Sequence, residues 1–273
     1  MNELLLNKKE ISCYYEINEI CRKINKGKSQ VEADNVIHTL YFNLVQTVES
    51  INLLVKEKKY LAAKSLFRKC IETTANINCI LEYPEAKIIV KKRAKLLNIF
   101  TMQHYMHRVS KLYSKMDDTE DKKEIETSVK YLSPLTGYKF ETISDALTYF
   151  TNERDKYYKN KSKNKKLWFT ACTDFKSKQD FIDRYGKISK KYTSFLYNMQ
   201  SEDTHGTGIL LSLGSKSLNG FSRQDWVLLV AINKLLEEPT TYLIVYSKAK
   251  NKCGTQIDYL LTQDEKNKKY WEK

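Results

Sequence analysis

Three polar residues recur at intervals of four in the second half of the chain. Tyr197, Ser201 and His205 are followed at once by Gly206. Residues spaced by four share one face of an α-helix, and glycine commonly follows the last helical turn. His205 would then lie at a helix C-terminus, where the dipole favours the imidazolium form. Such a histidine can act as a general acid or base, or it can only cap free carbonyl groups.

A second pair with the same spacing, Arg68 and Glu72, lies in the mostly apolar stretch 66–72. The simplest interpretation is an intrahelical ion pair, which contributes about 0.3 kcal/mol at a surface. A charged pair in a core-facing stretch is costly unless other polar groups complement it. The polar face described above offers such partners from another helix. We therefore predict one convergent catalytic site formed by Arg68, Glu72, Ser201 and His205.

The most basic segment of the chain is 154–166, where seven positive residues and one negative residue give a net charge of +6. Cationic side chains contact nucleic-acid phosphates, and aromatic rings stack on bases. The candidate nucleic-acid contacts are Arg154, Lys156, Lys159, Lys161, Lys163, Lys165, Lys166 and Trp168. The alternative is an exposed, solvated loop between helices. The net charge of the whole chain, +14, fits a lysine-rich surface as well as an attraction to nucleic acid.

Metal and cofactor chemistry has little support in the sequence. His104 and His107 lie three residues apart, but two ligands do not make a metal site, so we expect both on a helix surface. His38 is expected at the surface or as a hydrogen-bonded core histidine. The six cysteines form no C-x-x-C pair, which suggests reduced, partly buried thiols in the cytoplasm. No phosphate-binding glycine loop or dinucleotide fingerprint occurs, and no cofactor is expected.

The composition favours long helices, because only 8 glycines and 3 prolines occur in 273 residues. Apolar residues spaced by three and four predict helices over 34–55, 59–82, 85–115, 142–158, 178 to about 205, and 225–238. Pro239 is expected to end the last of these. The segment 240–246 fits a strand or a further helix, and the helix is favoured because no second strand could pair with it.

The predicted architecture is all-α, with residues 1–273 forming a single helical domain, a bundle with long central helices. The basic loop 154–166 belongs to that domain, and the charged tail 263–273 is expected to fray. No signal peptide is recognised, and the longest apolar run, 226–232, is too short to span a bilayer. We therefore expect no membrane association.

The spaced residues together resemble a known bacterial family, domain-of-unknown-function 5677. The similarity rests on Ser65-x-x-Arg68-x-x-x-Glu72, on Trp168, and on Tyr197-x-x-x-Ser201-x-x-x-His205-Gly206, over about residues 35–240. That family resembles the HEPN superfamily of helical bundles, many of which are ribonucleases of toxin–antitoxin and phage-defence systems. The resemblance implies a HEPN-like fold in which Arg68 holds phosphate and His205 is an acid or base. HEPN ribonucleases carry both residues close together on one helix, whereas no arginine occurs in 198–203.

Three functions follow as hypotheses. The first is a HEPN-like, metal-independent ribonuclease or toxin of a phage-defence or toxin–antitoxin system, in which Ser201 and Glu72 orient Arg68 and His205. The second is a non-catalytic module that binds RNA or a protein and uses the same residues as a structural polar network. The third is a metal-dependent enzyme, and only His104 and His107 support it. RNA, a protein partner or antitoxin, and a second copy of the chain are the candidate partners.

Overall fold

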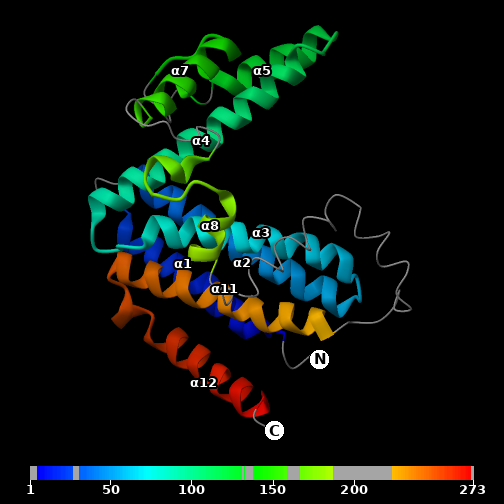
Figure 1. Ribbon diagram of the computed structural model, residues 1–273, viewed down its shortest axis with the longest axis vertical. Coiled ribbons are helices and arrows are strands. Elements are labelled where there is room, and N and C mark those ends of the chain that lie inside the picture. The colour runs from blue at the N-terminus through cyan, green and yellow to red at the C-terminus, as the bar shows by residue number, and fades with distance from the viewer. Residues whose placement is uncertain are drawn as a thin grey trace. The chain divides into compact units, whose positions relative to one another are not determined.

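The computed structural model describes residues 5–26, 31–130, 132, 138–158, 167–186 and 223–271. All regular secondary structure in these ranges is helical, so the chain belongs to the all-α class (Figure 1). The α-helices are α1 (Lys8–Asn25), α2 (Val31–Lys56), α3 (Tyr60–Leu81), α4 (Lys87–Tyr113), α5 (Thr119–Lys130), α7 (Ile143–Lys156), α8 (Lys178–Tyr185), α11 (Arg223–Ser247) and α12 (Gly254–Trp271). Two short 3-10 helices are η2 (Trp168–Ala171) and η3 (Lys250–Lys252).

The chain divides into two compact units. The first unit comprises residues 1–91 and 177–273, and the second comprises residues 92–176. The predicted helices over 34–55, 59–82, 85–115 and 142–158 are confirmed as α2, α3, α4 and α7. No helix in the described ranges is long and apolar enough to cross a membrane.

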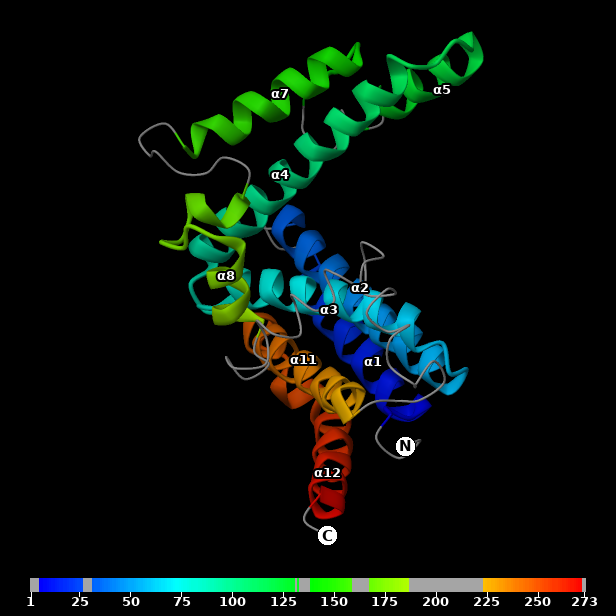
Figure 2. The same ribbon diagram turned by 45° about the vertical axis from the view of Figure 1, so that its right-hand side comes forward.

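In the first unit, α2 packs against α3 and α1, and α11 lies against α1, α2 and α3 (Figures 1 and 2). The core consists of apolar side chains that recur at three- and four-residue spacing on facing helices, among them Tyr41, Leu44, Phe67, Ile71 and Leu236. The sequence pattern gave no prediction for α1. A capping box starts α1, in which Asn7 Oδ1 accepts from the amide of Glu10 at 3.0 Å and Glu10 Oε2 accepts from that of Asn7 at 2.7 Å.

Pro239 does not end its helix, contrary to the prediction. Proline has no N–H group, so the carbonyl of Leu235 loses its intrahelical donor. Thr74 of α3 supplies a replacement, because its hydroxyl donates to that carbonyl at 3.2 Å. The helix therefore continues to Ser247, and the favoured interpretation of 240–246 as helix rather than strand is confirmed.

One further helix end differs from the prediction. The helix that starts at Lys178 ends at Tyr185 and not near 205. A Cβ atom at Gly186 would lie 3.1 Å from Ile71 Cγ2 of α3, so the missing side chain lets the backbone pass close to that helix. Residues 187–222 lie outside the described ranges. The charged tail lies in α12, which extends to Trp271, and Gln256 Nε2 of this helix donates to Glu16 Oε2 of α1 at 2.9 Å; the expected fraying stays a prediction.

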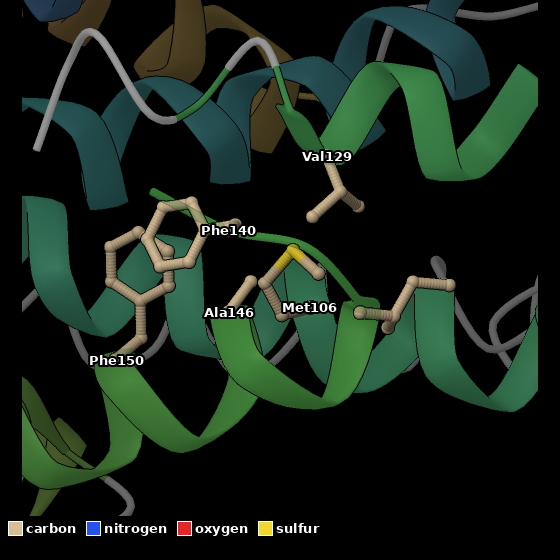
Figure 3. Close-up of a cluster of buried hydrophobic side chains, with 6 residues drawn as sticks. Met106, Val129, Phe140, Ala146 and Phe150 are labelled. Atoms are coloured by element: carbon tan, nitrogen blue, oxygen red, sulfur yellow. The ribbon is translucent and has the colours of Figure 1, made fainter. Parts of the chain in front are cut away.

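The second unit has its own apolar cluster (Figure 3). Met106 of α4, Val129 of α5, Phe140, and Ala146 and Phe150 of α7 point toward one another. A capping box begins α7, since the hydroxyl of Thr142 accepts from the amide of Asp145 at 3.1 Å. This box fixes the point at which the chain turns from Phe140 into the helix.

Candidate functional site

A cluster of three charged residues contains the first half of the predicted site. Arg68 Nε lies 3.2 Å from Glu72 Oε1, so the expected intrahelical ion pair is confirmed. Lys178 of α8 lies 2.9 Å from the same Glu72 oxygen. The three side chains are 21%, 33% and 44% exposed in the order Arg68, Glu72, Lys178. The pair is thus half-buried at the edge of the core rather than inside it.

The local sequence places each member of this Glu72 cluster. Arg68 and Glu72 lie one turn apart on α3, on the same face. On α8, the hydroxyl of Ser177 accepts from the amide of Asp180 at 3.1 Å, and this N-cap sets Lys178 in the first turn. Lys178 is the member that sequence analysis missed, because a helix start gives no signal about which neighbouring helix it contacts.

A second set of contacts holds the other end of α8 on α3. Arg184 Nη2 lies 3.5 Å from Glu82 Oε1, and the hydroxyl of Tyr185 donates to Glu82 Oε2 at 3.0 Å. Asn78 Nδ2 also donates to the carbonyl of Tyr185 at 2.9 Å. Contacts to Glu72 and Glu82 thus fix both ends of α8, and with them the position of Lys178.

The chemistry open to the Glu72 cluster follows from its charge. Two cations share one carboxylate, so the cluster carries a net positive charge at a half-buried position. Guanidinium and ammonium groups are the usual protein partners of phosphate oxygens. The cluster can therefore attract an anionic group such as a phosphodiester.

The other half of the predicted site lies outside the described residues. Ser201 and His205 fall in the segment 187–222, so their convergence with Arg68 and Glu72 stays a prediction. Five of the predicted nucleic-acid contacts are also outside, namely Lys159, Lys161, Lys163, Lys165 and Lys166.

The described part of the basic segment is more neutral than its composition suggests. Arg154 donates from both Nε and Nη2 to Asp155 Oδ1, at 3.0 and 2.8 Å. Lys156 pairs with Glu153, an acidic residue directly before the segment 154–166. Trp168 is only 5% exposed and packs edge-on against Phe169. Its ring is therefore not presented to solvent, and stacking on a base would require it to leave the core of its unit.

The histidines divide by burial. His38 is 4% exposed, with Nδ1 2.8 Å from Asn18 Oδ1 and Nε2 3.3 Å from Asn25 Nδ2. Burial lowers its pKa to about 4, so the ring is neutral at pH 7. Of the two expected positions, at the surface or in the core, His38 thus lies in the core as a hydrogen-bonded histidine. His104 and His107 are exposed on α4, as expected, and no group of three potential metal ligands occurs among the described residues.

Comparison with known proteins gives one match. A family model, described as a family of unknown function (DUF5677), matches residues 34–221, which is more than half of the chain. No curated protein and no solved structure matches. The matched range includes α3, α8 and therefore the whole Glu72 cluster.

Proposed function

The chain belongs to the family of unknown function DUF5677, and from that premise we propose that it is a HEPN-like ribonuclease that acts as a toxin or a phage-defence effector. In this proposal Arg68 holds an RNA phosphate and His205 transfers protons. Ser201 and Glu72 orient these two groups. The proposed reaction requires no metal, because a ribose 2′-hydroxyl can serve as the nucleophile.

One observation carries the proposal, which is the convergence of Arg68 and Lys178 on Glu72. The carboxylate fixes the guanidinium in place, and the second cation leaves the cluster positive. A fixed cation is worth more to a reaction than a mobile one, since no reorganisation is needed as charge develops. The family model supports the site further, because its match covers Ser201 and His205 as well as Arg68 and Glu72.

The proposed step is an internal transesterification. The 2′-oxygen forms a bond to the adjacent phosphorus while the bond from phosphorus to the 5′-oxygen breaks. A base takes the 2′-hydroxyl proton and an acid protonates the departing 5′-oxygen, which leaves a 2′,3′-cyclic phosphate and a 5′-hydroxyl. His205 supplies one of these two proton transfers, and Arg68 stabilises the charge that grows on the non-bridging oxygens.

The test uses the full chain with total RNA in excess EDTA. Cleavage by the wild type should be lost in His205→Ala and Arg68→Ala, and Arg68→Lys should recover only part of it, because an ammonium lacks the planar fork. Arg22→Ala is the matched control, since Arg22 forms a similar intrahelical pair with Glu19 at 2.9 Å on α1, outside the Glu72 cluster. Wild-type protein that cleaves no RNA, with or without added divalent metal, would refute the proposal. Induced expression that arrests growth in the wild type but not in His205→Ala would support the toxin role.

A second candidate function has its own observation. Glu72 also joins two helices, because it pairs with Arg68 on α3 and with Lys178 on α8. The cluster could thus serve only to hold α8 in register within a non-catalytic RNA- or protein-binding module. Melting temperature measured on the cleavage samples separates the two functions. If Arg68 is catalytic, Arg68→Ala should be inactive but as stable as the wild type. If Arg68 is structural, Arg68→Ala should lose stability, and the wild type should cleave no RNA.

A further inference from the structure

A cavity of about 560 Å³ lies between α1, α11 and α12, within the first unit. Its lining is mainly apolar and includes Leu6, Ile17, Ile244, Ile257 and Leu260. Cavities of this size and character are typical of sites for small molecules. The cavity contains no member of the Glu72 cluster, so a ligand bound there would be separate from the function proposed above. Residues of both α11 and α12 line the cavity, and Figure 1 shows that α12 begins near the end of α11.

Two polar side chains on α1 reach this cavity from positions one turn apart. Tyr14 lines it, is 6% exposed, and has no hydrogen-bond partner for its hydroxyl anywhere in the described ranges. Glu10 also lines it and is 6% exposed. Glu10 Oε2 accepts from the amide of Asn7 at 2.7 Å, and its Oε1 has no partner among the described residues. Neither atom is among the fully enclosed polar atoms of the described residues, so both stay accessible to a donor inside the cavity.

The charge at this end of the cavity specifies the missing partner. Glu237 of α11 and Asp264 of α12 join Glu10 in the lining. Burial first, and then these three carboxylates, raise the pKa of Tyr14, so its hydroxyl stays protonated. Lys248 and Lys250 line the opposite end, and Lys248 is roughly 16 Å from Glu237 along the axis of α11. The acidic end therefore attracts a cation.

We propose that the cavity binds a small amphipathic amine. Its ammonium group donates hydrogen bonds to Glu10 and to the Tyr14 oxygen, and its hydrocarbon body lies against Ile17, Ile244 and Leu260. This arrangement satisfies both unpartnered groups of α1 and removes the apolar wall from water.

The experiment is calorimetric titration of the full chain at pH 7 with n-octylammonium chloride. We expect one site per chain and an affinity at least about tenfold higher than that of n-octanol, which has the same body without charge. Ethylammonium, which lacks the body, and n-octanoate, which reverses the charge, should both bind more weakly than n-octylammonium. Equal affinity for n-octanol or n-octanoate would overturn the proposal, as would the absence of n-octylammonium binding.

Two variants locate the site. Glu10→Gln should weaken n-octylammonium binding about tenfold and Tyr14→Phe about fivefold, with little change in volume. The matched controls lie on the same helix outside the cavity. Glu19→Gln removes the same charge, and Tyr15→Phe removes a hydroxyl that instead donates to Glu49 at 2.9 Å. Both controls should bind like the wild type, and variants indistinguishable from their controls would refute the assignment.

Discussion

The helices α8 and α11 both pack on α3, but polar contacts of different kinds hold the two helices in place. Polar groups buried in the core hold α11, and most of them are neutral; the carboxyl group of Asp34, which accepts from the hydroxyl of Tyr246 at 2.6 Å, is an exception. Thr74 donates to the carbonyl of Leu235, the hydroxyls of Tyr41 and Thr240 are 2.6 Å apart, and Asn25 donates to Ser247 Oγ at 3.0 Å while contacting His38. Charged groups in contact with solvent supply most of the side-chain contacts of α8, through Glu72 with Lys178 and Glu82 with Arg184, beside the buried donation from Asn78 to the carbonyl of Tyr185.

The difference distinguishes structural polar groups from candidate functional ones. A neutral hydrogen bond in the core is costly to break, because its partner is left unsatisfied away from water. An ion pair in contact with solvent contributes little to stability, because water competes for both charges. The contacts of α11 thus define the fold, whereas those of α8 leave charged groups accessible to a ligand.

The largest effect is expected from removal of the buried histidine. His38→Ala deletes the ring and strands Asn18 Oδ1, so we expect a loss of about 3–5 kcal/mol in the free energy of unfolding. Urea unfolding measures this loss. His107→Ala, on the exposed face of α4, should stay within about 0.5 kcal/mol of the wild type. Equal losses in the free energy of unfolding of the two variants would contradict the distinction between buried and exposed polar groups.

The same histidine should make stability depend on pH. The folded-state pKa is about 4, below the value of roughly 6.5 for an unfolded chain. Between these values the unfolded state binds more protons, so its free energy falls relative to the folded state as pH drops. We expect the wild type to lose up to about 3 kcal/mol from this group between pH 7 and pH 4. In His38→Gln the loss over this range should be smaller by that amount, and an unchanged loss would contradict the assignment to His38.

A double-mutant cycle sharpens the account of α11. Thr74→Val removes the hydroxyl that serves the carbonyl of Leu235, at an expected cost of about 1–2 kcal/mol. Pro239→Ala restores an amide that can serve the same carbonyl within the helix. In that background the cost of Thr74→Val should shrink by about 1 kcal/mol. Additive costs would mean that the hydroxyl does not replace the proline's missing donor.

The smallest effect is expected for α8. Glu72→Gln should lower the free energy of unfolding by no more than about 1 kcal/mol, and the difference from the wild type should vanish in 1 M NaCl. Glu19→Gln is the matched control, because Glu19 also pairs with two cations, Arg22 and Lys23, but only within α1. A loss of several kcal/mol specific to Glu72→Gln would place the Glu72 cluster with the structural contacts.

Sequence periodicity identified the long helices well, because a core face repeats every three or four residues. Periodicity gave a wrong or incomplete prediction where a contact between residues far apart in the sequence determines a helix end or a site residue. Nothing near Pro239 reveals that Thr74, far away in the chain, compensates for the lost amide. Lys178 was missed for the same reason, as its partner is on α3. The pattern also gave no prediction for α1, in which polar Asn18 and Asn25 are buried because they hydrogen-bond to other helices.

The long-range contacts of α11 also determine when the first unit can fold during synthesis. Asn25 bonds to Ser247, 222 residues later, and Tyr41 meets Thr240 after 199 residues. At a synthesis rate of roughly 5–20 residues per second, on the order of 10–45 s pass between the synthesis of α1 and α2 and that of α11, which covers their apolar faces. The second unit is one continuous stretch, 92–176, and leaves the ribosome complete before α11 is made. Its folding therefore precedes that of the unit whose helices begin the chain.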